Sequence, residues 1–377
     1  MTYLKSVLII LVYLTGIVMS SGNEKRISVE PWGTLNGKQV TKFTLKNGNK
    51  QEVDVISYGA TITSIRTPDK TGKVEDVVCG FDNIEGYLRK DNPYFGATVG
   101  RVANRIGGGR FSIDNVPYQV SRNIDDKFTL HGGFKGWNSK IWEASVQNDT
   151  VVMALLSEDG DEGFPGAVIA FATFKLTEDG RLSIEMKATS TKATPINLTN
   201  HSYFNLAGHG TNAAEIYKHK VMIEADRWTV TDANSIPTGE IRPVDGSIMD
   251  LRKSTLLGDV INKVPGGGYD YNFCLTGKVD LEKEKFTARV LHPDSGRVLE
   301  VFTNQPGVQF YTSNFMPEAG TDGIPGKQGQ KYFKHGAFCL ETQNYPDAIN
   351  NDNFPNSILR PQELYYHVVT YKFGIQA

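Results

Sequence analysis

Short runs of apolar and β-branched residues recur along most of the chain and predict β-strands. The clearest runs cover residues 150–157, 167–176, 181–189 and 218–224. Clusters of Gly, Asp, Asn and Glu separate them, at residues 158–163, 178–180 and 208–212. Runs of this length, bounded by turn-forming residues, are typical of strands.

The N-terminal region repeats this pattern. Residues 44–46 lead into a turn at 47–49, and residues 53–58 continue beyond it, as in a β-hairpin. Amphipathic helical periodicity is scarce, and the best candidate is the short segment 84–89. Many short strands with regular turns predict an all-β fold, a sandwich or barrel built as one large domain. The Gly-rich segment 321–330 is predicted to be a surface loop rather than a linker.

The first 22 residues differ from the rest of the chain. Lys5 supplies a positive charge, residues 7–18 form an apolar run, and the small residues Ser20, Ser21 and Gly22 follow. This order is typical of a secretory signal peptide, and the run is shorter than the roughly 20 residues that span a bilayer. We therefore expect a signal peptide over 1–22, a folded domain over 23–377, and a secreted protein. An uncleaved signal anchor is the alternative.

Composition excludes several classes of protein. The chain has 377 residues, and 40 Lys and Arg against 42 Asp and Glu give a net charge of −2. With no basic stripe, neither a nucleic-acid partner nor an anionic membrane surface is expected. The three cysteines, Cys79, Cys274 and Cys339, have no metal or redox spacing and are predicted to be buried apolar residues. One disulfide among them remains open.

Two apolar segments contain titratable residues that are costly to bury unless they are paired or line a wet pocket. Strand alternation in segment 195–206 would place His201, Tyr203 and Asn205 on one face. In segment 338–343, Glu341 and Gln343 share a face. Taken alone, His201 fits a structural histidine and Glu341 fits a buried ion pair; equally, a carboxyl in apolar surroundings suits acid–base catalysis.

Three further groups of polar residues lie in Gly-rich or aromatic sequence. The Gly-rich segments 95–107 and 129–133 match no nucleotide-binding motif, which leaves hydrogen-bonding groups at Asn104, Arg105 and His131. Asp270 and Gln309 lie between aromatic residues. Aromatic rings beside carboxylate and amide groups are what a polyhydroxylated ring needs for binding.

Taken together, these segments resemble the aldose 1-epimerase (galactose mutarotase) family. They match the family's motifs in its order, from about residue 30 to the end, and read ISYGATI at 56–62, GRVANRI at 100–106, LHGG at 130–133, NHSYFNL at 200–206, YD at 269–270, GVQFYT at 307–312 and LETQ at 340–343. The resemblance implies a large all-β sandwich, the galactose mutarotase-like supersandwich, with the sugar in a cleft on one sheet.

The resemblance also implies roles for residues. His201 matches the family's general acid and Glu341 its general base, while the substrate-binding groups match Asn104, Arg105, His131, Asp270 and Gln309. It implies α/β interconversion of free hexoses such as galactose and glucose by ring opening and closure, without a metal or organic cofactor. The expected partner is a small sugar, with no nucleic acid and no membrane after signal cleavage, and the protein is expected to be a monomer or weak dimer.

Other functions remain open from the residues. A non-catalytic carbohydrate-binding protein on the same fold would not need both His201 and Glu341. A glycoside hydrolase needs two carboxylates, for which Asp270 and Glu341 could be considered. A hexose-phosphate mutarotase would call for added Lys or Arg near the motifs. Of three N-glycosylation patterns, those at Asn197 and Asn200 lie within the candidate site, which leaves Asn148 as the plausible acceptor.

Overall fold

The computed structural model describes residues 26–278 and 280–376. The predicted signal peptide, 1–22, lies outside this range, so its processing stays a prediction. Within the described part of the chain, no helix is both long and apolar enough to cross a membrane.

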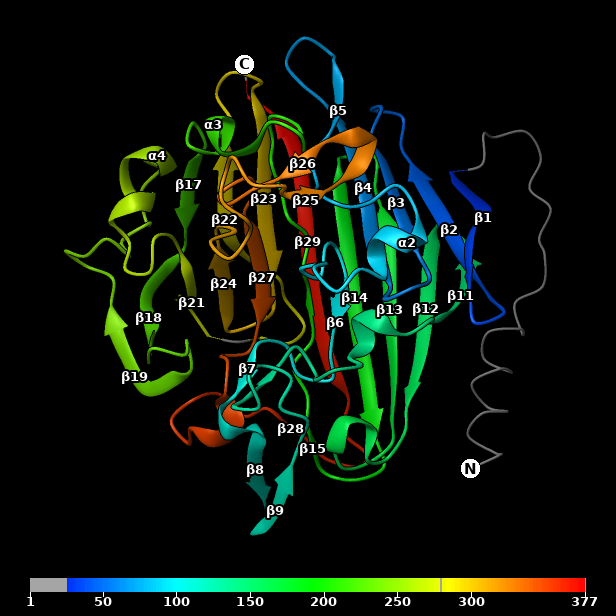
Figure 1. Ribbon diagram of the computed structural model, residues 1–377, viewed down its shortest axis with the longest axis vertical. Helices are drawn as coiled ribbons and strands as arrows, with labels where there is room; N and C mark the ends of the chain where they lie inside the picture. The colour runs from blue at the N-terminus through cyan, green and yellow to red at the C-terminus, as the bar shows by residue number, and fades with distance from the viewer. Residues whose placement is uncertain (1–25, 279, 377) are drawn as a thin grey trace.

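The largest element is an antiparallel sheet of nine strands (Figure 1). Its long strands alternate between buried and half-exposed residues, because side chains of a strand point to opposite faces. The strands follow one another in the order β11 (Glu143–Gln147), β12 (Thr150–Ser157), β13 (Val168–Leu176), β14 (Arg181–Ser190), β29 (Tyr365–Ile375), β23 (Arg297–Thr303), β22 (Lys285–Leu291), β17 (Lys220–Ile223) and β20 (Thr255–Leu256).

Two sheets of five strands complete the sandwich, one toward each side of the long central strand β29 in Figure 1. The first consists of β1 (Ile27–Leu35), β2 (Lys38–Lys46), β3 (Glu52–Ile56), β4 (Thr61–Pro68) and β5 (Val74–Asp76). The second, which carries much of the candidate site, has the order β19 (Pro237–Pro243), β18 (Ala225–Thr231), β21 (Asp270–Leu275), β24 (Gly307–Tyr311) and β27 (Cys339–Gln343).

Short elements connect and cover these sheets. Within residues 26–278 and 280–376 the α-helices are α2 (Ile84–Tyr87), α3 (Asn212–Ile216) and α4 (Leu257–Val260). Five two-stranded pairs are β6 (Thr98–Val99) with β16 (Thr199–Asn200), β7 (Arg105–Ile106) with β10 (Thr129–Leu130), β8 (Arg110–Ile113) with β9 (Val116–Gln119), β15 (Thr194–Pro195) with β28 (Ile358–Leu359), and β25 (Ile324–Pro325) with β26 (Lys331–Tyr332).

One continuous hydrophobic core joins the three large sheets. It contains Phe43 from the first five-stranded sheet, Phe174 and Val369 from the nine-stranded sheet, and Phe273 and Leu340 from the second five-stranded sheet, all buried. Burial of apolar area on this scale is the main force that holds two packed layers of sheet together. The predicted all-β sandwich is therefore confirmed.

Most predicted strands are present with small changes at their ends, and so are the hairpin of β2 with β3 and the short helix α2. The strand predicted through His201 is largely wrong. Within 195–206, only Pro195, at the end of β15, and Thr199–Asn200 lie in strands, and the backbone from His201 onward is irregular apart from an isolated bridge at Phe204. Cys79, Cys274 and Cys339 are free and buried, as predicted.

Candidate active site

A cavity of about 160 Å³ lies at the second five-stranded sheet and brings the predicted site residues together. It is much smaller than the roughly 300–1,000 Å³ of sites for drug-sized ligands, in keeping with a single small ring. Gln309 does not line the cavity but is hydrogen-bonded to Asp270, which does. The lining residues predicted from sequence are His201, Glu341, Asn104, Arg105, His131 and Asp270.

The backbone of His201 is fixed between neighbouring segments. Its N–H donates to the carbonyl of Ala97, and its carbonyl accepts from the N–H of Gly96, both at 2.9 Å. The ring of Tyr203 stacks on the imidazole with centroids 5.0 Å apart and an interplanar angle of 9°. The imidazole is therefore held in place although its segment is not a regular strand.

Glu341 is placed by the register of β27 against β24. It lies directly opposite Gln309, and Gln309 in turn lies opposite Asn272 of β21. The next residue, Thr342, points the other way and its hydroxyl bonds Nε2 of His367 on β29 at 2.8 Å. Strand alternation thus places Glu341 toward the cavity while its neighbour is anchored in the core.

Buried hydrogen bonds join the segment of His201 to the strand of Glu341. The hydroxyl of Thr199 donates to the carbonyl of Thr342 at 2.9 Å. Asn197 donates to the carbonyl of Asn344 and accepts from its N–H, at 3.1 and 2.9 Å. These bonds set the spacing of two residues that are far apart in the sequence.

The nearest nitrogen and oxygen of the central pair, His201 Nε2 and Glu341 Oε2, are 3.6 Å apart. Both side chains are almost fully buried. Burial lowers the pKa of His201 to about 3. Burial raises the pKa of Glu341 well above its ordinary value; the nearby charge of Asp270 acts in the same direction and that of Arg105 opposes it. Low dielectric surroundings therefore disfavour a net charge on the pair.

Asn104 and His131 are held to each other by two hydrogen bonds. The N–H of Asn104 donates to Nδ1 of His131 at 3.1 Å, and the N–H of His131 donates to the carbonyl of Asn104 at 3.0 Å. Both residues have left-handed backbones, with φ of 64° and 51°. Such conformations are strained for non-glycine residues and are concentrated at functional sites.

The hydrogen bond from the Asn104 N–H also fixes which ring nitrogen of His131 carries the proton. Burial, together with the charges of His201 and Arg105, lowers its pKa well below the ordinary value, so the ring is neutral. Because Nδ1 accepts a hydrogen bond, Nε2 carries the proton. His131 therefore offers an N–H donor to a ligand in the cavity.

Arg105, Asp270 and Gln309 form one polar cluster. An oxygen of Asp270 lies 3.4 Å from the Arg105 guanidinium, and its other oxygen accepts from Nε2 of Gln309 at 2.7 Å. The guanidinium also donates to Asn104 Oδ1 at 3.3 Å. The carboxylate of Asp270 is thus paired with Arg105 and held in place by Gln309, which suits it to accept hydrogen bonds from hydroxyl groups.

Sequence reasoning missed an aromatic rim. Tyr94 lies nearly parallel to the His201 ring at 5.9 Å and meets His131 edge-on at 4.6 Å. Phe315 stacks against Tyr311 at 6.0 Å and is 71% exposed, although it lines the cavity. Tyr94 directly precedes the Gly-rich segment and Phe315 closely follows the segment of Gln309, so proximity to these motifs was the available signal.

The site also contains residue types that bind zinc. The possible ligand atoms of His131, His201 and Glu341 all lie within 4.8 Å of one another. The hydrogen bond to Nδ1 of His131 leaves a protonated Nε2 rather than a free lone pair. Metal binding through Nε2 would therefore break the bond that anchors His131. The trio suits proton transfer and hydrogen bonding better than metal coordination.

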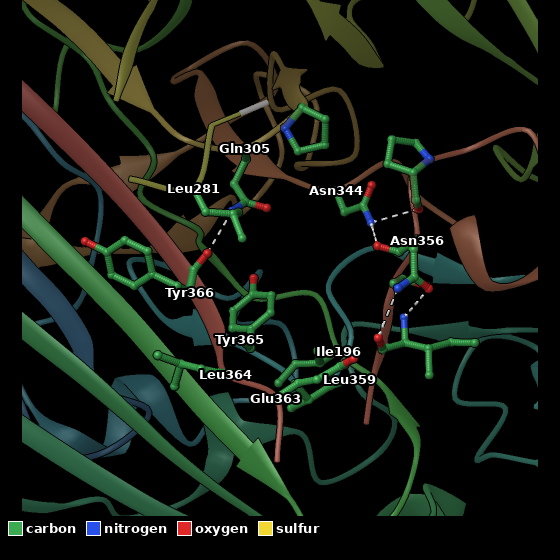
Figure 2. Close-up of a pocket in the computed structure, with 14 residues that line it drawn as sticks. Ile196, Leu281, Gln305, Asn344, Asn356, Leu359, Glu363, Leu364, Tyr365 and Tyr366 are labelled. Carbon is green, nitrogen blue, oxygen red and sulfur yellow. Dashed lines mark hydrogen bonds between the residues drawn. The ribbon is translucent and has the colours of Figure 1, made fainter. Parts of the chain in front are cut away.

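A larger cavity, of about 530 Å³, lies elsewhere (Figure 2). Glu363 is the only carboxylate among its lining residues, which include no histidine. Asn344 lines it, and the figure shows its side-chain amide bonded to the backbone of residues 355 and 356. These bonds hold the chain just after the Glu341 strand, and the cavity itself offers no acid–base pair.

Comparison with known proteins agrees with this geometry. Residues 41–372 match the sequence profile of the family described as aldose 1-epimerase. Galactose mutarotase from Rattus norvegicus is 48% identical over 339 residues, 90% of this chain and 95% of the relative. Aldose 1-epimerase from Escherichia coli K12 is 34% identical, over 90% and 96%. The chain belongs to the aldose 1-epimerase family.

Solved structures of aldose epimerases share the fold. An aldose epimerase homologue from C. elegans superposes with a TM-score of 0.80 at 29% identity, covering 89% of this chain and 98% of the other. Galactose 1-epimerase from Lactobacillus acidophilus gives 0.78 at 26% identity, over 93% and 99%. As an aldose 1-epimerase family member, the protein is an isomerase on a galactose mutarotase-like sandwich.

Proposed function

We propose that this protein interconverts the α and β anomers of free hexoses such as galactose and glucose, with His201 as general acid and Glu341 as general base. The observation that carries the proposal is the 3.6 Å separation of His201 Nε2 and Glu341 Oε2 in a buried cavity. The two oxygens that exchange protons in mutarotation share one carbon, C1. An acid and a base this close can reach both oxygens at once.

The reaction is two coupled proton transfers. Glu341 takes the proton of the C1 hydroxyl, the bond from C1 to the ring oxygen breaks, and His201 gives its proton to that oxygen. The open aldehyde then rotates about its C1–C2 bond. Closure on the opposite face reverses both transfers: Glu341 gives its proton to the carbonyl oxygen at C1, and His201 takes the proton from the former ring oxygen, so the enzyme ends as it began.

The perturbed pKa values fit this cycle when the two residues are treated as one coupled unit. Before ring opening the pair holds one proton, on His201; after it the pair still holds one proton, on Glu341. The form with protonated His201 and ionised Glu341 opens the ring, and the form with neutral His201 and protonated Glu341 closes it. Burial disfavours both the empty pair and the doubly protonated pair, since each carries a net charge.

The other cavity residues supply binding and charge stabilisation. His131 donates through Nε2–H, Arg105 donates through its guanidinium, and Asp270 accepts from sugar hydroxyls while Asn104 and Gln309 hold their partners in place. Preorganised donors of this kind stabilise charge that develops as the ring opens. The exposed ring of Phe315 offers an apolar surface to a sugar face.

The geometry favours this function over the alternatives. Asp270 is held by Arg105 and Gln309, which does not suit it as the second catalytic carboxylate of a glycoside hydrolase. The cavity lining has no lysine, and its arginine is already paired, which favours a neutral sugar over a sugar phosphate. A binding protein without activity is distinguished by assay.

The deciding experiment is polarimetry of freshly dissolved α-galactose and α-glucose. Addition of the protein is expected to speed the approach to the equilibrium rotation. Glu341→Gln and His201→Asn should each lose about 10²–10⁴-fold in kcat while remaining folded. Glu363→Gln, which alters the carboxylate of the larger cavity, is the control and should retain activity. No acceleration by the folded wild-type protein would refute the proposed function.

We further propose export, followed by cleavage after the signal segment 1–22, and a monomer or weak dimer in the mature state. Asn148 is exposed, so it can accept a glycan, whereas Asn197 and Asn200 are buried. The N-terminal sequence of protein from the culture medium tests cleavage, and its mass before and after glycosidase treatment tests the glycan. Size-exclusion chromatography with light scattering tests the assembly state. Protein retained in cells with Met1 intact would contradict export.

A further inference from the structure

Four buried side chains and the partly buried Arg105, in and behind the cavity wall, carry buried polar atoms without a protein partner. In the described part of the chain, Asn272 and Gln343 have both amide atoms unbonded, and one atom each is unbonded on Gln309, Glu341 and Arg105. Buried polar atoms without partners are rare in folded proteins, and each one calls for an explanation. A group of them on neighbouring strands points to one shared cause.

Strand register places four of these side chains side by side. Asn272, Gln309 and Glu341 are direct neighbours across β21, β24 and β27. Gln343 lies two residues beyond Glu341 on the same face of β27, opposite Gly307. The polar atoms therefore continue behind Glu341, on the side away from Asp270 and Tyr311, which line the cavity.

Gly307 provides the space for this arrangement. A Cβ atom at this position would lie 2.4 Å from Oδ1 of Asn272 and 3.1 Å from the ring of Tyr345. The Asn272 side chain thus lies over the glycine, between its own strand and Gln343. A Cβ atom at this position would overlap the Asn272 amide and force it to move.

A sugar in the cavity would not reach Asn272 or Gln343. Neither lines the cavity, and they are 1% and 0% exposed. The two amides also do not bond each other, although they present donors and acceptors of complementary type. Internal water is the ligand that fits, because a buried water typically makes about three hydrogen bonds to such otherwise unpaired groups.

We propose that Asn272 and Gln343 are positioning residues that hold internal water molecules behind Glu341, and that these waters donate hydrogen bonds to its carboxylate. The waters accept from the two amide nitrogens and donate to the amide oxygens and to Oε2 of Glu341. Hydrogen bonds to the ionised carboxylate favour the form with its proton on His201, which is the form that opens the ring. The inference rests on the proposed function.

Other groups near Glu341 act on the same equilibrium. Its charged neighbours are Asp270 on β21, which disfavours the carboxylate, and Arg105 on β7, which favours it. His201 lies 3.6 Å away, and neutral His131 lies within the same trio. The remaining titratable groups stay protonated because burial raises their pKa values, and these are Tyr203, Tyr311, Cys339 and Tyr371.

The test compares Asn272→Leu and Gln343→Met with Thr229→Val. The control removes another fully buried, unbonded polar group from the same sheet, on β18. In each of the first two variants kcat is expected to fall about tenfold with KM within about twofold, as for loss of one bond to a charged group. The limb of the pH–rate profile that belongs to Glu341 should move to higher pH, and the control should change neither.

Two further measurements support the test, and the first, on the wild-type protein, needs no folded variant. A high-resolution crystal structure should show ordered water within about 3.2 Å of the Asn272 and Gln343 amides. Infrared difference spectra against Glu341→Gln report the protonated fraction of that carboxyl, which should rise in Asn272→Leu. Dry density, or folded variants with unchanged kcat, pH profile and infrared band, would overturn the inference. Absence of mutarotation in the wild type refutes the proposed function instead, and leaves the water and infrared measurements standing.

Discussion

The coupled pair of His201 and Glu341 leads to a specific prediction for the pH dependence of mutarotation. The active pair holds one proton, so activity is lost at low pH when a second proton binds and at high pH when the last one leaves. An unperturbed pair would show a bell with limbs at about 4.3 and 6.5. The structure predicts a much wider plateau.

The width follows from burial and from distance. Burial lowers the pKa of His201 to about 3 and raises that of Glu341, which moves the two limbs apart. Opposite charges 3.6 Å apart attract by about 5 kcal/mol at an effective dielectric constant near 20. That attraction equals roughly three pKa units and stabilises the same one-proton state. Added to the ordinary separation of about two units, it gives a plateau of roughly five pH units.

The assay is initial-rate polarimetry with α-glucose, corrected at each pH for the spontaneous reaction in buffer. Circular dichroism at the same pH values restricts the profile to folded protein. A flat kcat/KM across neutral pH, with any decline confined to the extremes, is expected. A bell with limbs near 4.3 and 6.5 would show that the pair titrates as two solvated, independent groups, and would refute this account of the site.

Three further predictions concern residues outside the pair. Gly132→Ala places a Cβ atom 2.1 Å from the carbonyl oxygen of Gly100, at a backbone φ of 85°. Gly160→Ala is the control, because its φ is 84° but its Cβ meets no atom within 4 Å. The Tm of Gly132→Ala should fall well below that of Gly160→Ala, and equal Tm values would contradict the close approach. His131→Phe leaves the Asn104 N–H unpaired, so the free energy of unfolding should fall by about 1–3 kcal/mol. The same change removes a hydrogen-bond donor to the sugar, so KM should rise. Unchanged values of both would exclude the assigned role. Burial raises the pKa of Asp347 to about 6. The protonated carboxyl therefore stabilises the folded protein below the ordinary carboxyl pKa, and this contribution to the free energy of unfolding is lost as pH rises through 6. Asp347→Asn should therefore gain up to about 3 kcal/mol over wild type above pH 6 and little at pH 4 in denaturant titrations, whereas a pH-independent difference would argue against that pKa shift.

The sequence by itself determined much of this protein. Alternating residues in strands such as β13 and β14 reveal which face is buried, because the period of two is a local property of the backbone. The order of the motifs pointed to the family. It also supplied all seven site residues that the structure brings into or beside one cavity.

Only the tertiary structure decided how those residues work. The register of β27 against β24 and the bonds from Thr199 and Asn197 set the spacing of His201 and Glu341, which are 140 residues apart in sequence. The irregular backbone at His201 was predicted as strand because the residue types alternate along 201–206; the structure holds His201 by backbone bonds to Gly96 and Ala97 and by stacking on Tyr203 instead. Local patterns record the face on which a side chain lies, whereas distances, protonation and unpaired amides depend on segments that meet only in the folded chain.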